Sequence, residues 1–311
     1  MQEGSSKAIV AALIANFGIC CAKFVGFMVT GASSMMAEAV HSLADTGNQA
    51  LLLWGGKAAR KKATADHPFG YGRERYFWSF VVAQVIFALG ALFAIYEGVE
   101  KLRHPHPLES PIWAVGILAF AILLEGYSFM TAIKEGKKAK GTASWRNFIK
   151  HTKKPELPVV LLEDLGAMVG LVVALIGITL AMVTGNARFD AMGSIAIGIL
   201  LGAISVVLAI EMKSLLIGEG VTSAQEKTIK TTVEGTERVN RLIHMRTLYI
   251  GPDELLVAMK VELIQGLSGI DVASIINTLE TNIRAALPEA RMIYVEPDIF
   301  QEGRTDKVYP S

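Results

Sequence analysis

Six long apolar segments dominate the first part of the chain, and each is close to the roughly 20 residues that a helix needs to cross a bilayer. They span residues 7–29, 36–57, 77–100, 111–134, 157–184 and 189–212. Isolated strands of this length would leave backbone groups unpaired in lipid, so the pattern predicts α-helices. After residue 213 the long apolar runs end, which indicates a separate small domain outside the membrane.

The segment 214–311 shows the pattern of a small α+β domain. Helices are predicted at 223–235 and 270–286, and strands at 238–249, 254–263 and 291–296, with a turn at Gly251-Pro252-Asp253. The order α-β-β-α-β favours helices on one face of a three-stranded sheet, whose strand order the pattern does not give. A domain of this size buries only a modest core, which favours a homodimer formed through it.

Composition strengthens the membrane interpretation. The mean hydropathy is +0.42, and 52% of the residues are hydrophobic while 19% are charged. A soluble domain carries about 25% charged residues. We therefore expect an integral membrane protein: an all-α six-helix transmembrane domain, 1–213, followed by a cytoplasmic α+β domain, 214–311. Cys20 and Cys21 are adjacent, which excludes a disulfide framework.

The distribution of Lys and Arg predicts the orientation in the membrane. Six lie in the loop between the second and third segments and eight in the loop between the fourth and fifth, whereas the loops on the other side hold three. Because positive loops stay in the cytoplasm, both termini are expected to be cytoplasmic. No transit peptide precedes the first segment, which favours a prokaryotic inner (plasma) membrane. The net charge of +1 gives no sign of nucleic-acid binding.

Polar side chains interrupt the second apolar segment. His41 and Asp45 are four residues apart, so on a helix they lie one turn apart on one face. Asn48 continues that stripe, and Glu38 lies just before it. An imidazole with a carboxylate suits Zn²⁺, and less exclusively Co²⁺, Fe²⁺ or Mn²⁺. Two ligands do not complete such a site, so others must come from elsewhere. The alternative is an interhelical hydrogen bond that holds the bundle together.

The fifth apolar segment carries Glu163 and Asp164 side by side in its middle. Carboxylates buried in a membrane face a cavity or a partner. Adjacent residues point about 100° apart on a helix, so at most one of the two faces the ion of the second segment directly. In the first segment, Lys23 is expected to pair with an acid such as Glu125 or Asp190, or to reach the membrane interface.

Three stretches together resemble the cation diffusion facilitators, a family of zinc transporters with six membrane helices and a cytoplasmic metallochaperone-like tail. "SSMMAEAVHSLADTGNQ" resembles the second-helix motif that supplies half of the transport site. "DHPFGYGRERYFW" resembles the family's second loop and the entry to its third helix. "RFDAMGSI" resembles the start of its sixth helix, although Ala191 stands where the family usually has proline. The resemblance covers nearly the whole chain.

The resemblance carries a set of roles over to this chain: His41, Asp45 and Asp164 as metal ligands, Glu163 as a ligand or proton carrier, and Asn48 as a further ligand. The family usually has a second His/Asp-x-x-x-Asp motif on its fifth helix. Here Val160 stands four residues before Asp164. This departure is similar to a divergent branch that includes the mitochondrial-type zinc exporters of animals, and it makes selectivity for zinc over Mn²⁺ or Fe²⁺ less secure.

The family's secondary metal sites are eroded in this sequence. In the loop after the second segment, the resemblance implies a weak regulatory site at Asp66 and His67, but Tyr71 replaces the second histidine of the usual H-x-x-x-H. A capped turn in a loop rich in Pro and Gly is the alternative. In the tail, His244 is the only histidine, and no tail metal site is expected.

Together these features predict a divalent metal efflux transporter, with Zn²⁺ as the favoured substrate, that exchanges metal for protons by alternating access. The expected partners are the metal ion, protons, the lipid bilayer and a second copy of the chain; no resident cofactor is expected. Hydrolase motifs such as GxSxG or HExxH are absent from the sequence, so an enzyme is not expected. The alternative function is a non-transporting membrane metal sensor or regulatory subunit, which the departure on the fifth helix motivates.

Overall fold

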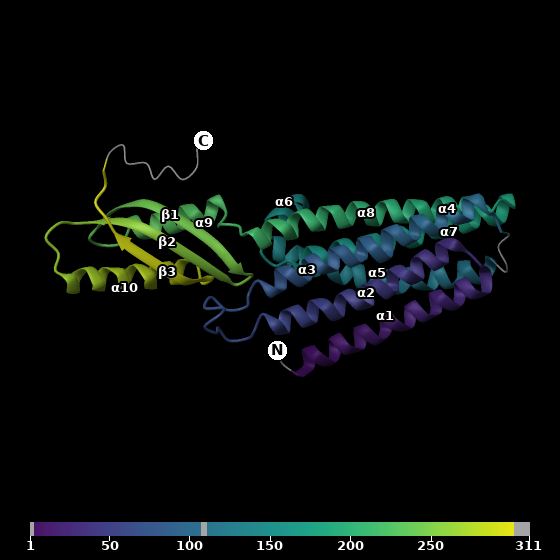
Figure 1. Ribbon diagram of the computed structural model, residues 1–311, viewed down its shortest axis with the longest axis horizontal. Coiled ribbons are helices and arrows are strands. Elements are labelled where there is room, and N and C mark those ends of the chain that lie inside the picture. The colour runs from purple at the N-terminus through teal and green to yellow at the C-terminus, as the bar shows by residue number, and fades with distance from the viewer. Residues whose placement is uncertain (1–2, 107–110, 302–311) are drawn as a thin grey trace. The chain divides into compact units, whose positions relative to one another are not determined.

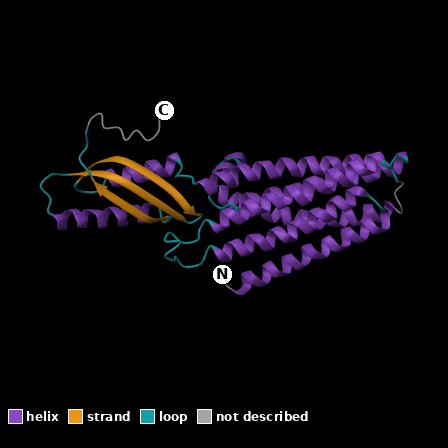
Figure 2. Ribbon diagram, in the orientation of Figure 1, coloured by secondary structure: helices purple, strands orange, loops and turns teal. Residues whose placement is uncertain are grey.

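A computed structural model describes residues 3–106 and 111–301, with the backbone alone described for 3–16, 87 and 111. The chain divides into two compact units, Met1–Thr64 with Arg73–Leu216, and Ala65–Gly72 with Ile217–Ser311. The first unit is a bundle of helices and the second holds a small sheet (Figures 1 and 2). The chain ends predicted to be cytoplasmic, 1–2 and 302–311, lie outside the described residues.

The bundle contains every predicted apolar segment within a helix. Its elements are α1 (Glu3–Thr30), α2 (Ser33–Ala58), α3 (Glu74–Val85), the π-helix η1 (Ile86–Ala91), α4 (Leu92–Arg103), α5 (Pro111–Lys140), α6 (Trp145–His151), α7 (Glu156–Thr184) and α8 (Arg188–Ile217). The third apolar segment is α3, η1 and α4 together. The basic loop expected after the fourth segment is partly helical, because α5 continues to Lys140 and Ser144 caps α6 by accepting a hydrogen bond from the Asn147 amide.

Four helical stretches are long and apolar enough to cross a membrane: Glu74–Arg103, Ile112–Lys140, Glu156–Thr184 and Arg188–Ile217. In α1, the fully described part Phe17–Thr30 is apolar but shorter. Polar residues interrupt α2, where Glu38 and His41 are completely buried. Large apolar side chains such as Met28 and Ile199 are exposed on the outside of the bundle. An apolar bundle with an apolar exterior is an integral membrane domain.

Two glycines bring the backbone of α8 into direct contact with the end of η1 and with α4. A Cβ atom at Gly198 would lie 2.8 Å from the carbonyl oxygen of Ala91, and one at Gly98 would lie 2.8 Å from that of Ala191. Small residues at such crossings allow the close packing that holds helices together in a membrane. This crossing fixes α8 against the end of the third apolar segment.

The second unit follows the predicted order α-β-β-α-β. Its elements are α9 (Ser223–Glu234), β1 (Val239–Gly251), β2 (Glu254–Leu263), α10 (Gly269–Ala286) and β3 (Ala290–Pro297). The strand order is β1-β2-β3, with β1 antiparallel and β3 parallel to β2. Alternate residues of β2 pack against both helices in one core that includes Ile229, Val257, Val261, Leu279 and Ile283. The helices therefore cover one face of the sheet.

The glycine crossing gives a prediction about stability. We expect Gly198→Ala to lower the free energy of unfolding by about 1–3 kcal/mol, because its methyl group overlaps backbone atoms that cannot move aside. Gly202→Ala, in the same helix, places its methyl group 3.7 Å from the Ala91 side chain and is expected to be neutral or stabilising. Chemical unfolding of the full chain in detergent micelles measures both. Equal stabilities for the two variants would contradict the crossing.

Candidate metal site in the membrane bundle

The polar residues of α2 divide its buried face into two adjoining sides. At about 100° per residue, Glu38 and Ser42 lie about 40° apart, while His41 and Asn48 lie about 20° apart on the neighbouring side. Asp45 falls between them. All five are buried. Because α2 contacts α1, α3, α4 and α7, this face is turned toward other helices.

The first side of α2 is paired with a buried lysine. The Lys23 ammonium of α1 donates to Glu38 Oε2 at 3.1 Å and to Ser42 Oγ at 2.7 Å. Glu125 Oε1 of α5 lies 3.8 Å from the same Nζ atom. Lys23 and Glu38 are fully buried. The predicted pairing of Lys23 with Glu125 is therefore confirmed, and Glu38 is a closer partner.

The second side of α2 holds polar atoms without hydrogen-bond partners. Both ring nitrogens of His41, Asp45 Oδ1 and Asn48 Oδ1 are buried and accept or donate no hydrogen bond among the described residues. His41 Nδ1 and Asp45 Oδ1 are 3.4 Å apart. Leaving such atoms unpaired costs about 1–3 kcal/mol each. Unpaired nitrogen and oxygen atoms that face each other are the ligands a divalent cation would take.

The adjacent acids of α7 point to different helices. Glu163 faces α2: its Oε1 atom accepts a hydrogen bond from Asn48 Nδ2 at 2.8 Å, and its carboxyl group interacts with that of Asp45. Asp164 faces α5 and accepts a hydrogen bond from Ser128 Oγ at 3.2 Å. The structure thus brings Glu163 into the group on α2, whereas the family resemblance puts Asp164 first. Two buried carboxylates repel each other, so a cation or a proton between Asp45 and Glu163 is stabilising.

A π-helix lies beside the imidazole of His41. A Cβ atom at Gly90, in η1, would lie 3.9 Å from His41 Nδ1. Single π-helical turns inside α-helices occur frequently at functional sites. The sequence gives no signal for this turn, because a local widening of the helix leaves the apolar pattern unchanged. The imidazole therefore lies within van der Waals range of this turn.

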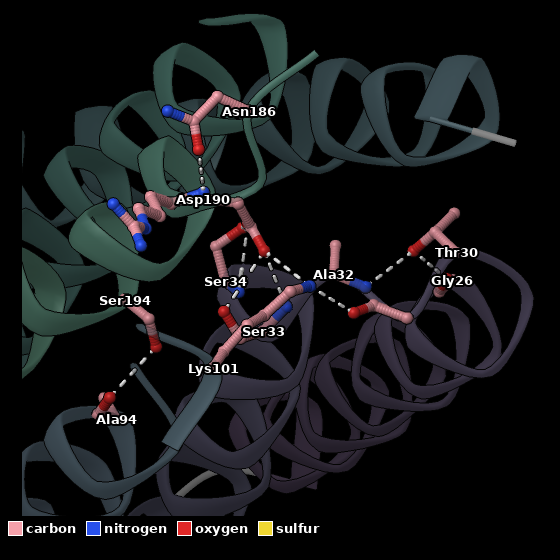
Figure 3. A network of polar contacts seen from close by, with 12 residues as sticks. Gly26, Thr30, Ala32, Ser33, Ser34, Ala94, Lys101, Asn186, Asp190 and Ser194 are labelled. Atoms are coloured by element: carbon pink, nitrogen blue, oxygen red, sulfur yellow. Dashed lines mark hydrogen bonds and ion pairs between the residues drawn. The ribbon is translucent and has the colours of Figure 1, made fainter. Parts of the chain in front are cut away.

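The N-terminus of α2 is held by a carboxylate from another helix (Figure 3). The residue that precedes α2, Ala32, has no side-chain acceptor. Asp190 of α8 supplies one: it accepts from the amides of Ser33 at 2.8 Å and Ser34 at 3.3 Å, and from both hydroxyl groups. A carboxylate at this end also interacts favourably with the helix dipole. Asp190 therefore fixes the position of α2 relative to α8.

A second buried lysine completes this anchor. Lys101 Nζ of α4 donates to Asp190 Oδ2 at 3.0 Å and also to the Gly31 carbonyl oxygen, which lies between α1 and α2. Asp190 is fully buried. The expectation that Lys23 pairs with Asp190 is thus replaced by Lys101, which lies at the same end of the bundle as the start of α2. Buried charges of opposite sign that are also hydrogen-bonded are the form in which ions are tolerated in an apolar interior.

The remaining predicted site residues, Asp66 and His67, belong to the second unit. Asp66 and His67 are both exposed in the loop Ala65–Gly72. The His67 ring lies 4.6 Å, between ring centroids, from that of Tyr71, the residue that replaces the family's second histidine. In the sheet domain, Lys260 Nζ lies 3.3 Å from Glu296 Oε1 and 3.3 Å from Asp298 Oδ2. These carboxylates raise the pKa of Lys260, so the two acids are paired with a cation of the chain itself.

The bundle site holds side chains of the metal-ligand type that are not gathered around one point. Among the described residues, no three His, Cys, Asp or Glu side chains are gathered as a preformed metal centre. His41 Nδ1 lies 3.4 Å from Asp45 Oδ1, and Glu163 of α7 reaches α2 through its hydrogen bond with Asn48. An imidazole together with carboxylates is a ligand type that zinc takes in proteins.

These features define a class of protein: an integral membrane bundle with a buried polar site between two of its helices. The chain belongs to the cation efflux family, since residues 9–217 match the family described as the cation efflux transmembrane domain. It is 35% identical over 245 residues to the mouse "Proton-coupled zinc antiporter SLC30A9, mitochondrial", which covers 78% of this chain and 43% of that protein.

Two further similarities extend the comparison. The Arabidopsis thaliana "Metal tolerance protein C4" is 33% identical over 253 residues, which covers 81% of this chain and 55% of that protein. The solved C-terminal domain of MamM in its nickel form is 15% identical and covers 26% of this chain and 100% of that domain, with a TM-score of 0.24. The chain spans about half the length of the curated relatives it matches.

The anchor at the start of α2 can be tested through stability. We expect Asp190→Ala to lower the free energy of unfolding by about 3–5 kcal/mol, because it leaves Lys101 buried without its counter-charge. The double variant Asp190→Ala/Lys101→Met should recover part of that loss. Glu135→Ala, which removes an exposed partner of Lys138, should cause no measurable change. Chemical unfolding of the full chain in detergent measures all three, and a double variant no more stable than Asp190→Ala would argue against the pair.

Proposed function

We propose that this chain is an efflux transporter for a divalent metal cation, most favourably Zn²⁺, that works as a metal–proton antiporter by alternating access. The observation that supports it best is the group of unpartnered atoms on His41, Asp45 and Asn48, opposite Glu163 and inside an apolar bundle. Burying unpaired polar atoms in a membrane costs free energy, and residues of this kind typically mark ion pathways. Relatives named as a zinc antiporter and a metal tolerance protein agree with this function.

In this proposal the ligands are His41, Asp45 and Glu163, with Asn48 orienting Glu163 through its hydrogen bond. Asp164 serves as an outer group that exchanges protons or holds the metal on its way, since its carboxylate is turned to α5. An imidazole and carboxylates also bind Mn²⁺, Fe²⁺ and Co²⁺, so these ions are competing substrates. Val160 stands where the family usually has a His or Asp ligand. With one ligand fewer, the site discriminates less between Zn²⁺ and these ions.

Proton coupling follows from the chemistry of the same groups. Metal ligands must be deprotonated to bind, so each metal that enters the site releases protons from it. The facing carboxylates of Asp45 and Glu163 repel each other when both are ionised, which makes the empty site take up a proton. Reorientation of the helices then releases the metal to the other side, and protons reload the site. Acidification on the side where metal binds should therefore slow its entry.

The proposed arrangement in the membrane has six spanning helices, with α1 and α2 crossing in addition to the four apolar stretches, and both termini in the cytoplasm. The loops rich in Lys and Arg support this orientation. We place the protein in a prokaryotic inner membrane, where a proton gradient is available; the relative named as mitochondrial makes an organelle membrane the alternative. Fractionation of cells that express the tagged chain tests this placement.

A homodimer through the sheet domain is part of the proposal. This domain exposes apolar side chains, among them Ile270, Tyr294 and Ile299. We expect them to contribute to the dimer interface, since contiguous exposed apolar patches mark interaction surfaces. Chemical cross-linking of the full chain in membranes measures the assembly.

Transport in proteoliposomes tests the function and the ligand set together. With an imposed pH gradient, the wild type should accumulate Zn²⁺ faster than empty vesicles and more slowly when the metal side is acidified. Asp45→Asn and Glu163→Gln should each reduce the rate by about 100-fold or more, since each removes a ligand. Asp164→Asn should reduce it less, because that carboxylate is held by Ser128. Glu135→Gln, an exposed acid of the same bundle, is the matched control.

The outcomes separate the competing functions. Uptake of one ion by the wild type, lost in Asp45→Asn and Glu163→Gln, supports the transporter and names its substrate when Mn²⁺, Fe²⁺ and Co²⁺ are offered separately. Metal binding without uptake by any form supports the membrane sensor or regulatory subunit. If Asp164→Asn lowers the uptake rate more than Glu163→Gln does, Asp164 is the metal ligand that the family resemblance implies.

A further inference from the structure

The buried cluster around Lys23 has no role in the proposed transport chemistry. Lys23 is fully buried in α1, and the two carboxylates that contact it come from α2 and α5. No described contact of its ammonium group reaches His41, Asp45 or Glu163. Burying a lysine in an apolar bundle costs free energy even when it is paired, so such a residue is a candidate for a functional role.

The cluster and the metal site share one face of one helix. Glu38 and Ser42, the partners of Lys23, occupy the side of α2 that adjoins His41 and Asp45, and Ser42 directly follows His41 in the chain. The second oxygen of Glu38, Oε1, makes no hydrogen bond among the described residues. A Cβ atom at Gly170 of α7 would lie 2.4 Å from that oxygen, so the carboxylate rests against the same helix that carries Glu163.

Lys23 therefore directs the Glu38 carboxylate. The ammonium group holds the Oε2 atom of Glu38 toward α1, while its Oε1 atom faces Gly170 of α7. Without the ammonium group, Glu38 would be a buried carboxylate one helical turn from His41, and an additional attraction for a cation. Charges in an apolar interior interact over longer distances than in water, because little screens them.

We propose that Lys23 is a fixed internal cation that sets the charge of the adjacent metal site and keeps Glu38 out of its ligand set. This inference rests on the proposed function, since it concerns how tightly that site holds a divalent cation. Lys23 acts here as a positioning residue: its charge opposes that of the metal and weakens binding, so the ion is released during the transport cycle instead of remaining bound.

Charge-changing variants with opposite expected effects test this role. Lys23→Met removes the positive charge and frees Glu38, so the Kd for Zn²⁺ should fall by about tenfold or more and metal release should slow. Glu38→Gln removes one of the two carboxylates that balance the lysine charge, so the Kd should rise by a similar factor. The double variant Lys23→Met/Glu38→Gln and the conservative Lys23→Arg should both lie within about threefold of the wild type.

The measurements use the purified full chain in lipid nanodiscs, with Zn²⁺ titrated against a fluorescent chelator, and parallel uptake into proteoliposomes. Lys138→Met, which removes an exposed lysine from the same bundle, is the control for a general change in net charge. Lys23→Met is expected to lower both the KM and the kcat of uptake, because tight binding slows release. A lysine that only holds α1 against α2 would instead reduce the amount of folded protein and leave the Kd unchanged.

The results distinguish the inference from the function on which it rests. Opposite shifts in Kd for Lys23→Met and Glu38→Gln that cancel in the double variant support it. If Lys23→Met does not fold, the other two variants carry the test. A Kd that rises in Glu38→Gln and returns toward the wild-type value in Lys23→Met/Glu38→Gln supports the inference. Normal Zn²⁺ uptake by the wild type with an unchanged Kd in these variants overturns the inference alone. A wild type that binds no divalent metal overturns both the inference and the proposed function.

Discussion

Polar side chains buried in an apolar bundle must find partners, and the arrangement of α2 follows from how this requirement is met along its length. At its start, Asp190 and Lys101 satisfy the helix terminus and each other. On one side of its middle, Lys23 satisfies Glu38 and Ser42. On the other side, the His41 ring nitrogens and one oxygen each of Asp45 and Asn48 have no hydrogen-bond partner within the described part of the chain. The anchored regions hold α2 in register, and the unpartnered atoms lie on the side of α2 that adjoins the Lys23 partners.

This contrast between paired and unpaired polar groups on α2 is the physical basis of the transport hypothesis. A fully satisfied polar network stabilises one arrangement, whereas a partly satisfied one gains free energy from whatever completes it. The open atoms belong to an imidazole, a carboxyl group and an amide oxygen, which a divalent cation or protons would complete. The two are alternatives for the same atoms, and that competition is the basis of metal–proton exchange. The π-helix beside His41 adds a backbone region that departs from regular geometry next to the group that must change its partners.

Much of this architecture could be predicted from the sequence, because apolar runs and periodicity are local signals. The helices, the α-β-β-α-β order and the stripe of His41 and Asp45 are examples. The partners of these residues were harder to predict, since they depend on the rotation and depth of each helix. Adjacent acids such as Glu163 and Asp164 differ by about 100° around the helix axis, and only packing decides which one faces α2. For the same reason Asp190 pairs with Lys101 and not with Lys23.

Zinc K-edge X-ray absorption on the zinc-loaded full chain in nanodiscs tests the central claim most directly, because it reports the ligand atoms themselves. A site built on α2 and α7 predicts nitrogen and oxygen neighbours at about 2.0–2.1 Å. It also predicts an imidazole contribution that disappears in His41→Ala. A sulfur shell at about 2.3 Å, which would indicate Cys20 or Cys21 as ligands, would contradict the account. An imidazole signal that persists in His41→Ala would contradict it equally.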